Sequence, residues 1–141
     1  MRQGYTLTEL VMVLTVVGIL AGIGTPHVIQ MRDTLAVEHA ARQIAVAHQR
    51  ARITAILRNC AMVLTISADS ITLRAKNGTT PLWREVGPGA TGVTFAAPLR
   101  QITFSAIGLA TEVGNYTYTV TRGDAHRSVI ISRLGRVRMT S

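Results

Sequence analysis

One carboxylate stands at the entrance of a long apolar run near the N-terminus, and this arrangement constrains the fold more than any other feature. After Glu9 the chain has no Asp, Glu, Lys or Arg until Arg32. The 22 residues from Leu10 to Met31 would form a helix of roughly 33 Å, which is long enough to cross a hydrocarbon core of about 30 Å. Burying a carboxylate there costs on the order of 2.5–3.5 kcal/mol. We therefore expect the charge of Glu9 to have a partner.

The residues after Arg32 continue the helix with an amphipathic pattern. Small and apolar residues recur at steps of three and four, the spacing of one helix face: Val37, Ala40, Ala41, Ile44, Ala47, Ala51 and Ala55. Glu38 and Arg42 are spaced for an ion pair on the outer side of the helix. We predict one helix from about Thr6 to Leu57, with Asn59 as its end.

The remainder of the chain is β-rich. Runs of alternating or β-branched residues predict strands at 62–66, 71–74, 81–86, 93–97, 101–105, 116–121, 128–132 and 136–139. Gly123-Asp124 is the strongest hairpin signal. Tyr116 and Tyr118 face one side of their strand, where they either pack in the core or stack on nucleic-acid bases. This order predicts an α+β fold, in which a long N-terminal helix packs on a C-terminal antiparallel β-sheet domain.

The N-terminal residues Gly4-Tyr5-Thr6-Leu7-Thr8-Glu9-Leu10 resemble the N-terminus of type IV pilins and type II secretion pseudopilins. Tyr5 stands where that family usually has Phe, and Thr8 where it has Ile. The resemblance implies that a prepilin peptidase cuts after Gly4 and that the new N-terminus, Tyr5, is methylated. It also implies that Glu9 neutralises the terminal amine of a neighbouring subunit in a filament. The family's helix proline matches Pro26, which is expected to kink or loosen the helix.

The resemblance divides the chain into three parts. Residues 1–4 are expected to be a leader peptide, residues 5–31 a transmembrane and filament-core helix, and residues 32–141 a periplasmic or extracellular pilin head. This is the pilin lollipop, with the first half of the helix in the membrane. The lone Cys60 excludes an internal disulfide, so the chain looks more like a minor pilin than a major one. The order of a long N-terminal helix followed by a sheet resembles the GspH/FimT minor pilin group in particular. An ordinary single-pass anchor is the alternative for the apolar run.

Positive charge is concentrated at the C-terminus. The formal net charge of the chain is +8, and Arg supplies 14 of the 15 basic residues. Arginine grips phosphates with a planar fork, although GC-rich codon usage also favours arginine. Residues 122–141 contain one acidic residue, Asp124, and five arginines: Arg122, Arg127, Arg133, Arg136 and Arg138. On an extended backbone Arg136 and Arg138 point the same way, about 6.6 Å apart, with Val137 turned to the core.

The stretch Gly135-Arg136-Val137-Arg138 resembles the Gly-Arg-x-Arg motif of FimT-type minor pilins that bind DNA during natural transformation. The resemblance implies a DNA-binding role for Gly135, Arg136 and Arg138, without sequence specificity. Arg133 would extend the patch, and Arg122 and Arg127 would join it if the hairpin brings them close. The alternative is a solvated basic face with a structural role, because GspH-type pseudopilins often end in a similar strand.

The sequence carries no pattern typical of catalysis or metal binding. His39 and His48 are nine residues apart, which places them on opposite sides of a helix. The seven acidic residues lack calcium-loop spacing, and no nucleophile elbow or phosphate-binding glycine loop is present. We predict a protein that is not an enzyme and that needs no metal or cofactor.

Together these features predict a minor type IV pilin that binds DNA through its C-terminal arginines and contributes to DNA uptake. Its expected partners are DNA, other pilins, the prepilin peptidase and the inner membrane. It would span that membrane once before assembly and lie in a pilus or pseudopilus, in the periplasm or at the cell surface, afterwards. The alternatives are a type II secretion pseudopilin, a purely structural minor pilin that primes assembly, and an unrelated membrane-tethered binding module.

Overall fold

The computed structural model describes residues 4–97, 101–111, 115–132 and 134–140. The chain forms two compact units, Met1–Arg32 and Asp33–Ser141. A single α-helix, α1 (Leu7–Leu57), contributes to both units. The second unit contains all the β-strands, and its own hydrophobic core lies between α1 and those strands.

The first unit consists mainly of the N-terminal half of α1. The hydroxyl of Thr6 accepts a hydrogen bond from the backbone N–H of Glu9 (3.3 Å) and so caps the first turn, where the carboxylate of Glu9 also suits the helix dipole. The backbone remains helical at Pro26. Every residue from 7 to 32 whose burial the structure describes is exposed, and this segment is long and apolar enough to cross a membrane.

The second half of α1 buries the predicted stripe. Its seven residues are each at most 2% exposed: Val37, Ala40, Ala41, Ile44, Ala47, Ala51 and Ala55. The helix ends as the sequence indicates, because Asn59 adopts a left-handed conformation (φ 47°). Its N–H donates to the carbonyl of Ile56 (3.1 Å), and the N–H of Cys60 donates to that of Ala55 (3.2 Å). This pair of bonds is the Schellman pattern that closes many helices.

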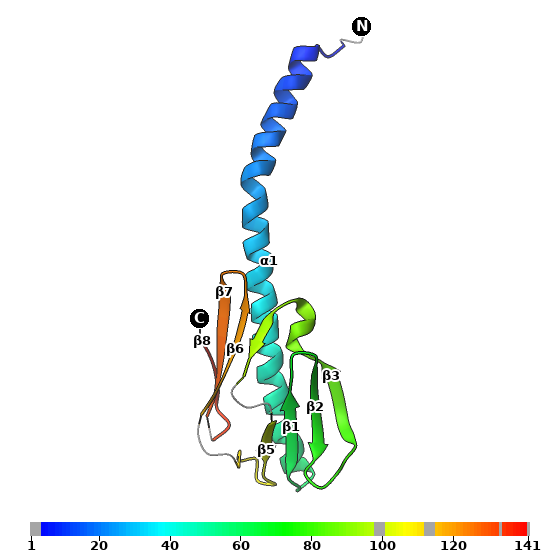
Figure 1. The fold of residues 1–141 in the computed structure, drawn as a ribbon, viewed down its shortest axis with the longest axis vertical. Helices are drawn as coiled ribbons and strands as arrows, with labels where there is room; N and C mark the ends of the chain where they lie inside the picture. Colours follow the sequence, from blue (N-terminus) through cyan, green and yellow to red (C-terminus); the bar gives the residue numbers. More distant parts are fainter. Residues whose placement is uncertain (1–3, 98–100, 112–114, 133, 141) are drawn as a thin grey trace. The chain divides into compact units, whose positions relative to one another are not determined.

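The strands form two antiparallel sheets along the second half of α1 (Figure 1). The first sheet has the order β3-β2-β1-β5 and the second has the order β4-β6-β7-β8. The first sheet contains β1 (Met62–Ile66), β2 (Ser70–Ala75), β3 (Pro81–Val86) and β5 (Gln101–Phe104). The second sheet contains β4 (Thr94–Ala96), β6 (Tyr116–Arg122), β7 (Ala125–Ile131) and β8 (Val137–Thr140). A short 3₁₀ helix, η1 (Pro88–Thr91), lies between β3 and β4.

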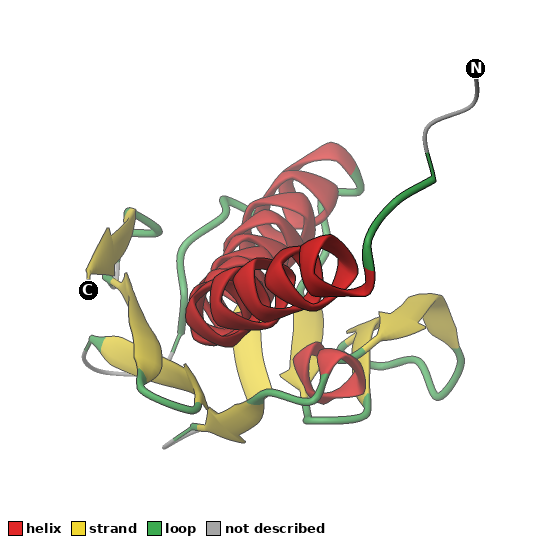
Figure 2. Cartoon of the chain, turned by 90° about the horizontal axis from the view of Figure 1, so that it is seen from above, coloured by secondary structure: helices red, strands yellow, loops and turns green. Residues whose placement is uncertain are grey.

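The predicted antiparallel fold is confirmed, although the strands divide into two sheets. The division arises because β5 returns to the free side of β1, whereas β4 pairs with β6. Seen from above, both sheets curve around the helix (Figure 2). The predicted hairpin at Gly123-Asp124 joins β6 to β7, and Arg122 pairs with Ala125 across it.

Side chains from both sheets meet the alanine-rich face of α1. Phe104 from the first sheet and Tyr118 from the second are fully buried there, and the ring of Tyr118 stacks on that of Phe95 with centroids 5.8 Å apart. Tyr116 is 2% exposed. Core packing, one of the two interpretations of the tyrosine pair, is therefore confirmed.

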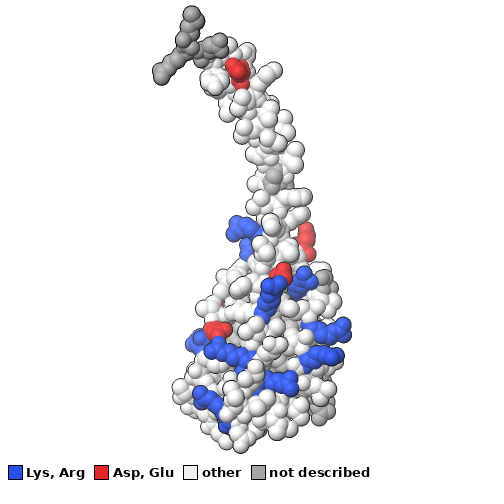
Figure 3. All heavy atoms as spheres, turned by 180° about the vertical axis from the view of Figure 1, so that it is seen from behind, with Lys and Arg blue, Asp and Glu red and all other residues white. Residues whose placement is uncertain are grey.

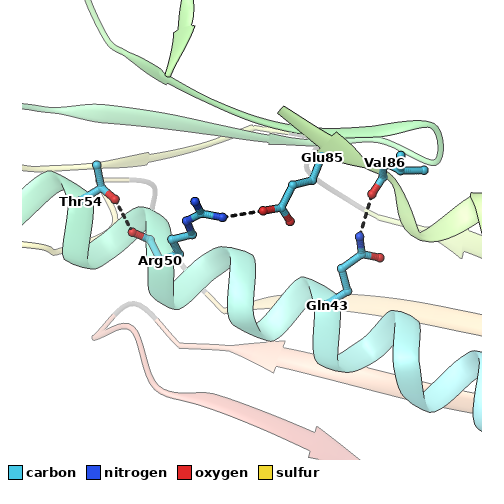
Figure 4. A network of polar contacts seen from close by, with 5 residues as sticks. All are labelled: Gln43, Arg50, Thr54, Glu85 and Val86. Atoms are coloured by element: carbon cyan, nitrogen blue, oxygen red, sulfur yellow. Dashed lines mark hydrogen bonds and ion pairs between the residues drawn. The ribbon is translucent and has the colours of Figure 1, made fainter. Parts of the chain in front are cut away.

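Polar contacts fix the first sheet to the helix near β3 (Figure 4). The amide of Gln43 donates to the backbone carbonyl of Val86 (2.7 Å), and Arg50 forms an ion pair with Glu85. The guanidinium of Arg50 also lies over the ring of Trp83, 4.9 Å from its centroid. These contacts hold the edge strand β3 against α1.

Candidate nucleic-acid interface

The turn between β7 and β8 places the Gly-Arg-Val-Arg stretch. The N–H of Ser132 donates to the carbonyl of Arg136 (2.9 Å), and the N–H of Gly135 donates to the carbonyl of Ser132 (2.8 Å). The hydroxyl of Ser132 accepts from the N–H of Arg136 (3.1 Å). Gly135 has φ 79°, which is the left-handed conformation that this kind of hairpin turn requires and that glycine adopts without strain.

Beyond this turn, Arg136 immediately before β8 and Arg138 within it are presented to solvent. Val137 pairs with Ile131 and Arg138 with Ile130. Val137 packs against the core, whereas Arg136 and Arg138 are exposed. The predicted alternation is thus confirmed. Because β8 is the last strand of its sheet, the two guanidinium groups lie on an open edge.

Hydroxyl groups cover the outward face of the second sheet. Side chains alternate between the two faces of a strand, so the residues that pair directly with the buried tyrosines lie on the inner face of the sheet. Arg138 and Ser128 lie on the opposite, outer face. None of the four strands contains Asp or Glu. Six hydroxyl residues occupy outward positions: Thr94, Thr117, Thr119, Thr121, Ser128 and Thr140.

Arg122 lies on the opposite face and is engaged within the head. It follows the buried Tyr118 and Val120 at two-residue steps along β6, so its side chain shares their face of the sheet and points toward the helix. Its Nε lies 2.7 Å from a carboxylate oxygen of Asp33, and one Nη donates to the backbone carbonyl of Thr91.

Arg127 also occupies the helix-facing side of the second sheet. It pairs with the buried Val120 and lines a small hollow together with Thr34 and Val37 of α1. The structure therefore brings Arg136 and Arg138 together but does not bring Arg122 and Arg127 to them. Arg133, the remaining candidate, lies outside the described residues.

The sequence did not single out Arg52, a residue of α1 that lies beside this motif. A Cβ atom at position 135 would fall 2.8 Å from Nη1 of Arg52. Arg52 is partly exposed. The closeness of Arg52 to Gly135 depends on how the β7–β8 turn packs against α1. The periodicity of the helix sequence does not predict that tertiary contact.

The electrostatics of the second unit favour an anionic partner. Residues 33–141 contain thirteen basic and six acidic residues, a net charge of +7. Figure 3 shows basic side chains spread over the visible face of this unit, with few acidic ones among them. Several carboxylates are already paired: Asp33 with Arg122, Glu38 with Arg42, and Glu85 with Arg50. No ion pair between described residues engages Arg52, Arg136 or Arg138.

His48 of α1 is buried in the core of the head. Its ring packs edge-on against Phe104, with centroids 4.8 Å apart. Burial, and secondarily the positive charge of Arg52, lowers the pKa of His48 to about 4. The imidazole is therefore neutral at physiological pH and adds no charge to the arginine edge.

The remaining candidate residues belong to the first unit. Gly4, Tyr5 and Glu9 are all exposed at or before the start of α1. Gly4 and Tyr5 precede the helix, and Glu9 lies in its first turn.

The long helix and the antiparallel sheets packed on its second half define a pilin-like protein. A family model described as Type II transport protein GspH matches residues 40–135. The chain is also 31% identical to the pilin-like protein PilA1 of Thermus thermophilus over an alignment of 155 positions, which covers 98% of each protein.

Solved structures share the fold. The type IV minor pilin FimU of Pseudomonas aeruginosa superposes with a TM-score of 0.64 at 20% identity, covering 74% of this chain and 88% of that one. The minor pseudopilin EpsH, from the Type 2 Secretion System of Vibrio cholerae, has a TM-score of 0.57 at 14% identity, covering 74% and 96%. The chain belongs to the GspH family and is a pilin-like protein.

Proposed function

We propose that this protein is a minor type IV pilin that binds DNA without sequence specificity and contributes to DNA uptake in natural transformation. The observation that carries the proposal is the exposed pair Arg136 and Arg138 on the open edge of a sheet whose strands contain no acidic residue. Gly135 fixes the turn that leads into this edge. In this proposal Arg122 and Arg127 lie on the inner side of the head and are not part of the DNA-binding surface.

The chemistry of the edge suits a phosphate backbone. Guanidinium groups bind phosphate oxygens through two parallel hydrogen bonds, and the outward hydroxyls of the second sheet are further donors of the kind that contact phosphates. Each phosphate contact releases counterions, so affinity falls with salt by a slope of about 0.9 per contact on a log–log plot for duplex DNA. Such contacts position DNA without reading its bases.

The N-terminal part supplies the setting for this activity. In the proposal, a prepilin peptidase cleaves after Gly4, Tyr5 is methylated, and the apolar half of α1 anchors the subunit in the inner membrane. Glu9 then pairs with the terminal amine of a neighbouring pilin in the filament. The head would thereby be carried to the periplasm or the cell surface, where it meets DNA.

The test is a salt-titrated DNA-binding measurement on the full-length chain in a non-ionic detergent. Changing Arg136→Ala together with Arg138→Ala should weaken binding to all sequences about equally and flatten the log–log salt slope by about 2, since two phosphate contacts are lost. The matched control changes Arg42→Ala and Arg84→Ala, which removes the same charge elsewhere. If the first double variant binds like the wild type, or no more weakly than the control, the site is wrong.

A second candidate is a minor pseudopilin of a type II secretion system, which the description of the matching family favours. That role predicts no DNA affinity and a surface for other pseudopilins. Deleting the gene in its native host separates the roles, because loss of transformation supports the first and loss of protein secretion supports the second. A purely structural minor pilin predicts loss of pili on deletion, with the arginine variants still transformable.

A further inference from the structure

The same turn occurs twice in the head, once in each sheet. The N–H of Ser105 donates to the carbonyl of Leu109 and the N–H of Gly108 to that of Ser105, both at 2.8 Å. The hydroxyl of Ser105 accepts from the N–H of Leu109 (3.2 Å). These three bonds repeat those of the Ser132–Arg136 turn. The two sequences share the pattern Ser-x-x-Gly, and Gly108 and Gly135 both have φ 79°.

Both glycines lie against the same helix residue. A Cβ at position 108 would fall 3.2 Å from Cγ of Arg52, and one at position 135 would fall 2.8 Å from its Nη1 and 3.2 Å from its Cδ and Cζ. The aliphatic part of the Arg52 side chain therefore lies against Gly108, and its guanidinium lies against Gly135. Real Cβ atoms essentially never approach within 3.0 Å, so a side chain at position 135 would make the flexible end of Arg52 shift away, while the φ angle of Gly135 itself favours glycine.

We propose that Arg52 is a third guanidinium of the DNA-binding surface, seated beside Arg136 by the two Ser-x-x-Gly turns. This inference rests on the proposed function and assigns a further phosphate-binding residue to the same site. The glycine of the Gly-Arg-Val-Arg stretch then has a defined role, because its missing side chain lets the guanidinium of the helix residue reach the edge that carries Arg136 and Arg138.

Position and surroundings favour a phosphate as the partner of Arg52. Its Nη1 lies against Gly135, whose Cα is about 3.8 Å from that of Arg136, so the guanidinium end of Arg52 lies close to the backbone from which Arg136 projects. Arg52 is partly exposed, and no ion pair between described residues engages it, so its positive charge is open to an incoming anion.

The experiment compares Arg52→Gln with the wild type and with Arg84→Gln, which removes one charge from the distant edge strand β3. All are full-length chains in non-ionic detergent, titrated with salt against duplex DNA. Arg52→Gln keeps most of the side-chain volume and should weaken binding on the order of five- to tenfold at 0.1 M salt, with the slope flatter by about 0.9. Its melting temperature should match that of the wild type, and Arg84→Gln should change neither quantity.

Arg52→Lys separates charge from packing. It should retain the salt slope, because one cation still faces the phosphate. If Arg52→Gln binds like the wild type while the Arg136→Ala, Arg138→Ala variant is weak, the role of Arg52 is wrong and the proposed function stands. If Arg52→Gln and the Arg136→Ala, Arg138→Ala variant both bind like the wild type, the whole arginine site is wrong, and if the wild type itself shows no salt-dependent DNA binding, the proposed function fails. If Arg52→Lys and Arg52→Gln lose affinity equally, with equal losses in melting temperature, Arg52 is a structural residue and the inference is overturned.

Discussion

Arginines of this head differ in role according to what surrounds each guanidinium. Arg50 lies over Trp83 and pairs with Glu85, while Arg122 is held by Asp33. Such partly exposed ion pairs each contribute only about 0–1 kcal/mol to stability, but they partly neutralise the positive charge of Arg50 and Arg122. Arg136 and Arg138 project from a sheet edge without a described carboxylate partner, so their positive charge remains available to a ligand. Residue type alone does not distinguish these roles.

Buried His48 should make the stability of the head depend on pH. Its pKa is about 4 in the folded protein and 6.5 ordinarily, so between these values the unfolded chain binds more protons than the folded one. Stability is therefore fully present above pH 6.5 and falls as the pH is lowered toward 4, by about 3 kcal/mol in all. We expect His48→Leu to abolish this component, measured as the difference in unfolding free energy between pH 7 and pH 5 by Trp83 fluorescence.

His48→Leu should also be no less stable than the wild type at pH 7. Both ring nitrogens of His48 are buried without a hydrogen-bond partner among the described residues, and unpaired buried polar atoms are costly. A variant that retains the full acid sensitivity of the wild type would show that other groups cause it.

At the scale of elements, the β6–β7 hairpin is tied to α1 at its turn. Gly123 has φ 55°, and a Cβ there would lie 2.9 Å from Oδ2 of Asp33. The adjacent Arg122 pairs with the same carboxylate. Because Gly123 has no side chain, the carboxylate of Asp33 can lie close to the turn. The Arg122–Asp33 ion pair then holds the hairpin against the helix.

Arg122→Gln tests whether this arginine acts in folding. The variant should lose about 1 kcal/mol of stability, which corresponds to a fall in melting temperature of about 4–8 °C for a domain of this size. Its DNA salt slope should equal that of the wild type, because Arg122 faces the helix. A flatter slope with an unchanged melting temperature would instead place Arg122 in the DNA-binding surface.

Much of the element order could be predicted from local patterns. The alanine stripe defined the buried helix face and Asn59 its end, because both depend on nearby residues. β7 begins at Ala125, three residues before its predicted start, because the hairpin has only two turn residues and pairing resumes at once. The division into two sheets could not be predicted, since it depends on which distant strands pair.

The candidate site was only partly predictable for the same reason. The two-residue spacing of Arg136 and Arg138 fixes their common direction. The outward direction of that pair depends on the length of the β7–β8 turn, and the inward direction of Arg122 and Arg127 on the register of β6 with β7. The contact of Arg52 with Gly135 requires three elements to meet, which no local pattern records.

For the whole molecule, the division into an apolar exposed unit and a self-contained head matches a subunit that polymerises through its N-terminus. The described residues 7–32 bury nothing within the chain, so their apolar side chains need a lipid or protein environment to leave water. The head has its own core.

We expect the mature protein to begin with a methylated Tyr5 and to need Glu9 for filament entry. Glu9→Ala should reduce incorporation into filaments on the order of tenfold or more, because an ion pair shielded from water exceeds the about 1.4 kcal/mol that a factor of ten requires. Mass spectrometry of the N-terminus and immunoblots of sheared filaments provide the measurements.

Thr8→Ala is a suitable control, since it changes a neighbouring side chain without removing a charge. An intact initiator methionine on the purified protein, or normal incorporation of Glu9→Ala, would contradict the pilin-type assembly that the N-terminus implies.

The alanine stripe of α1 has a consequence for how this head can vary between species. Five of the seven residues on the buried helix face are alanines, so only Val37 and Ile44 among them have side chains that could be shortened to accommodate a change on the strands. An enlarged residue on the stripe would have to be matched by a smaller one on a facing strand, such as at Phe104. Related proteins should therefore show paired size changes between helix and strands, while the outward positions diverge independently.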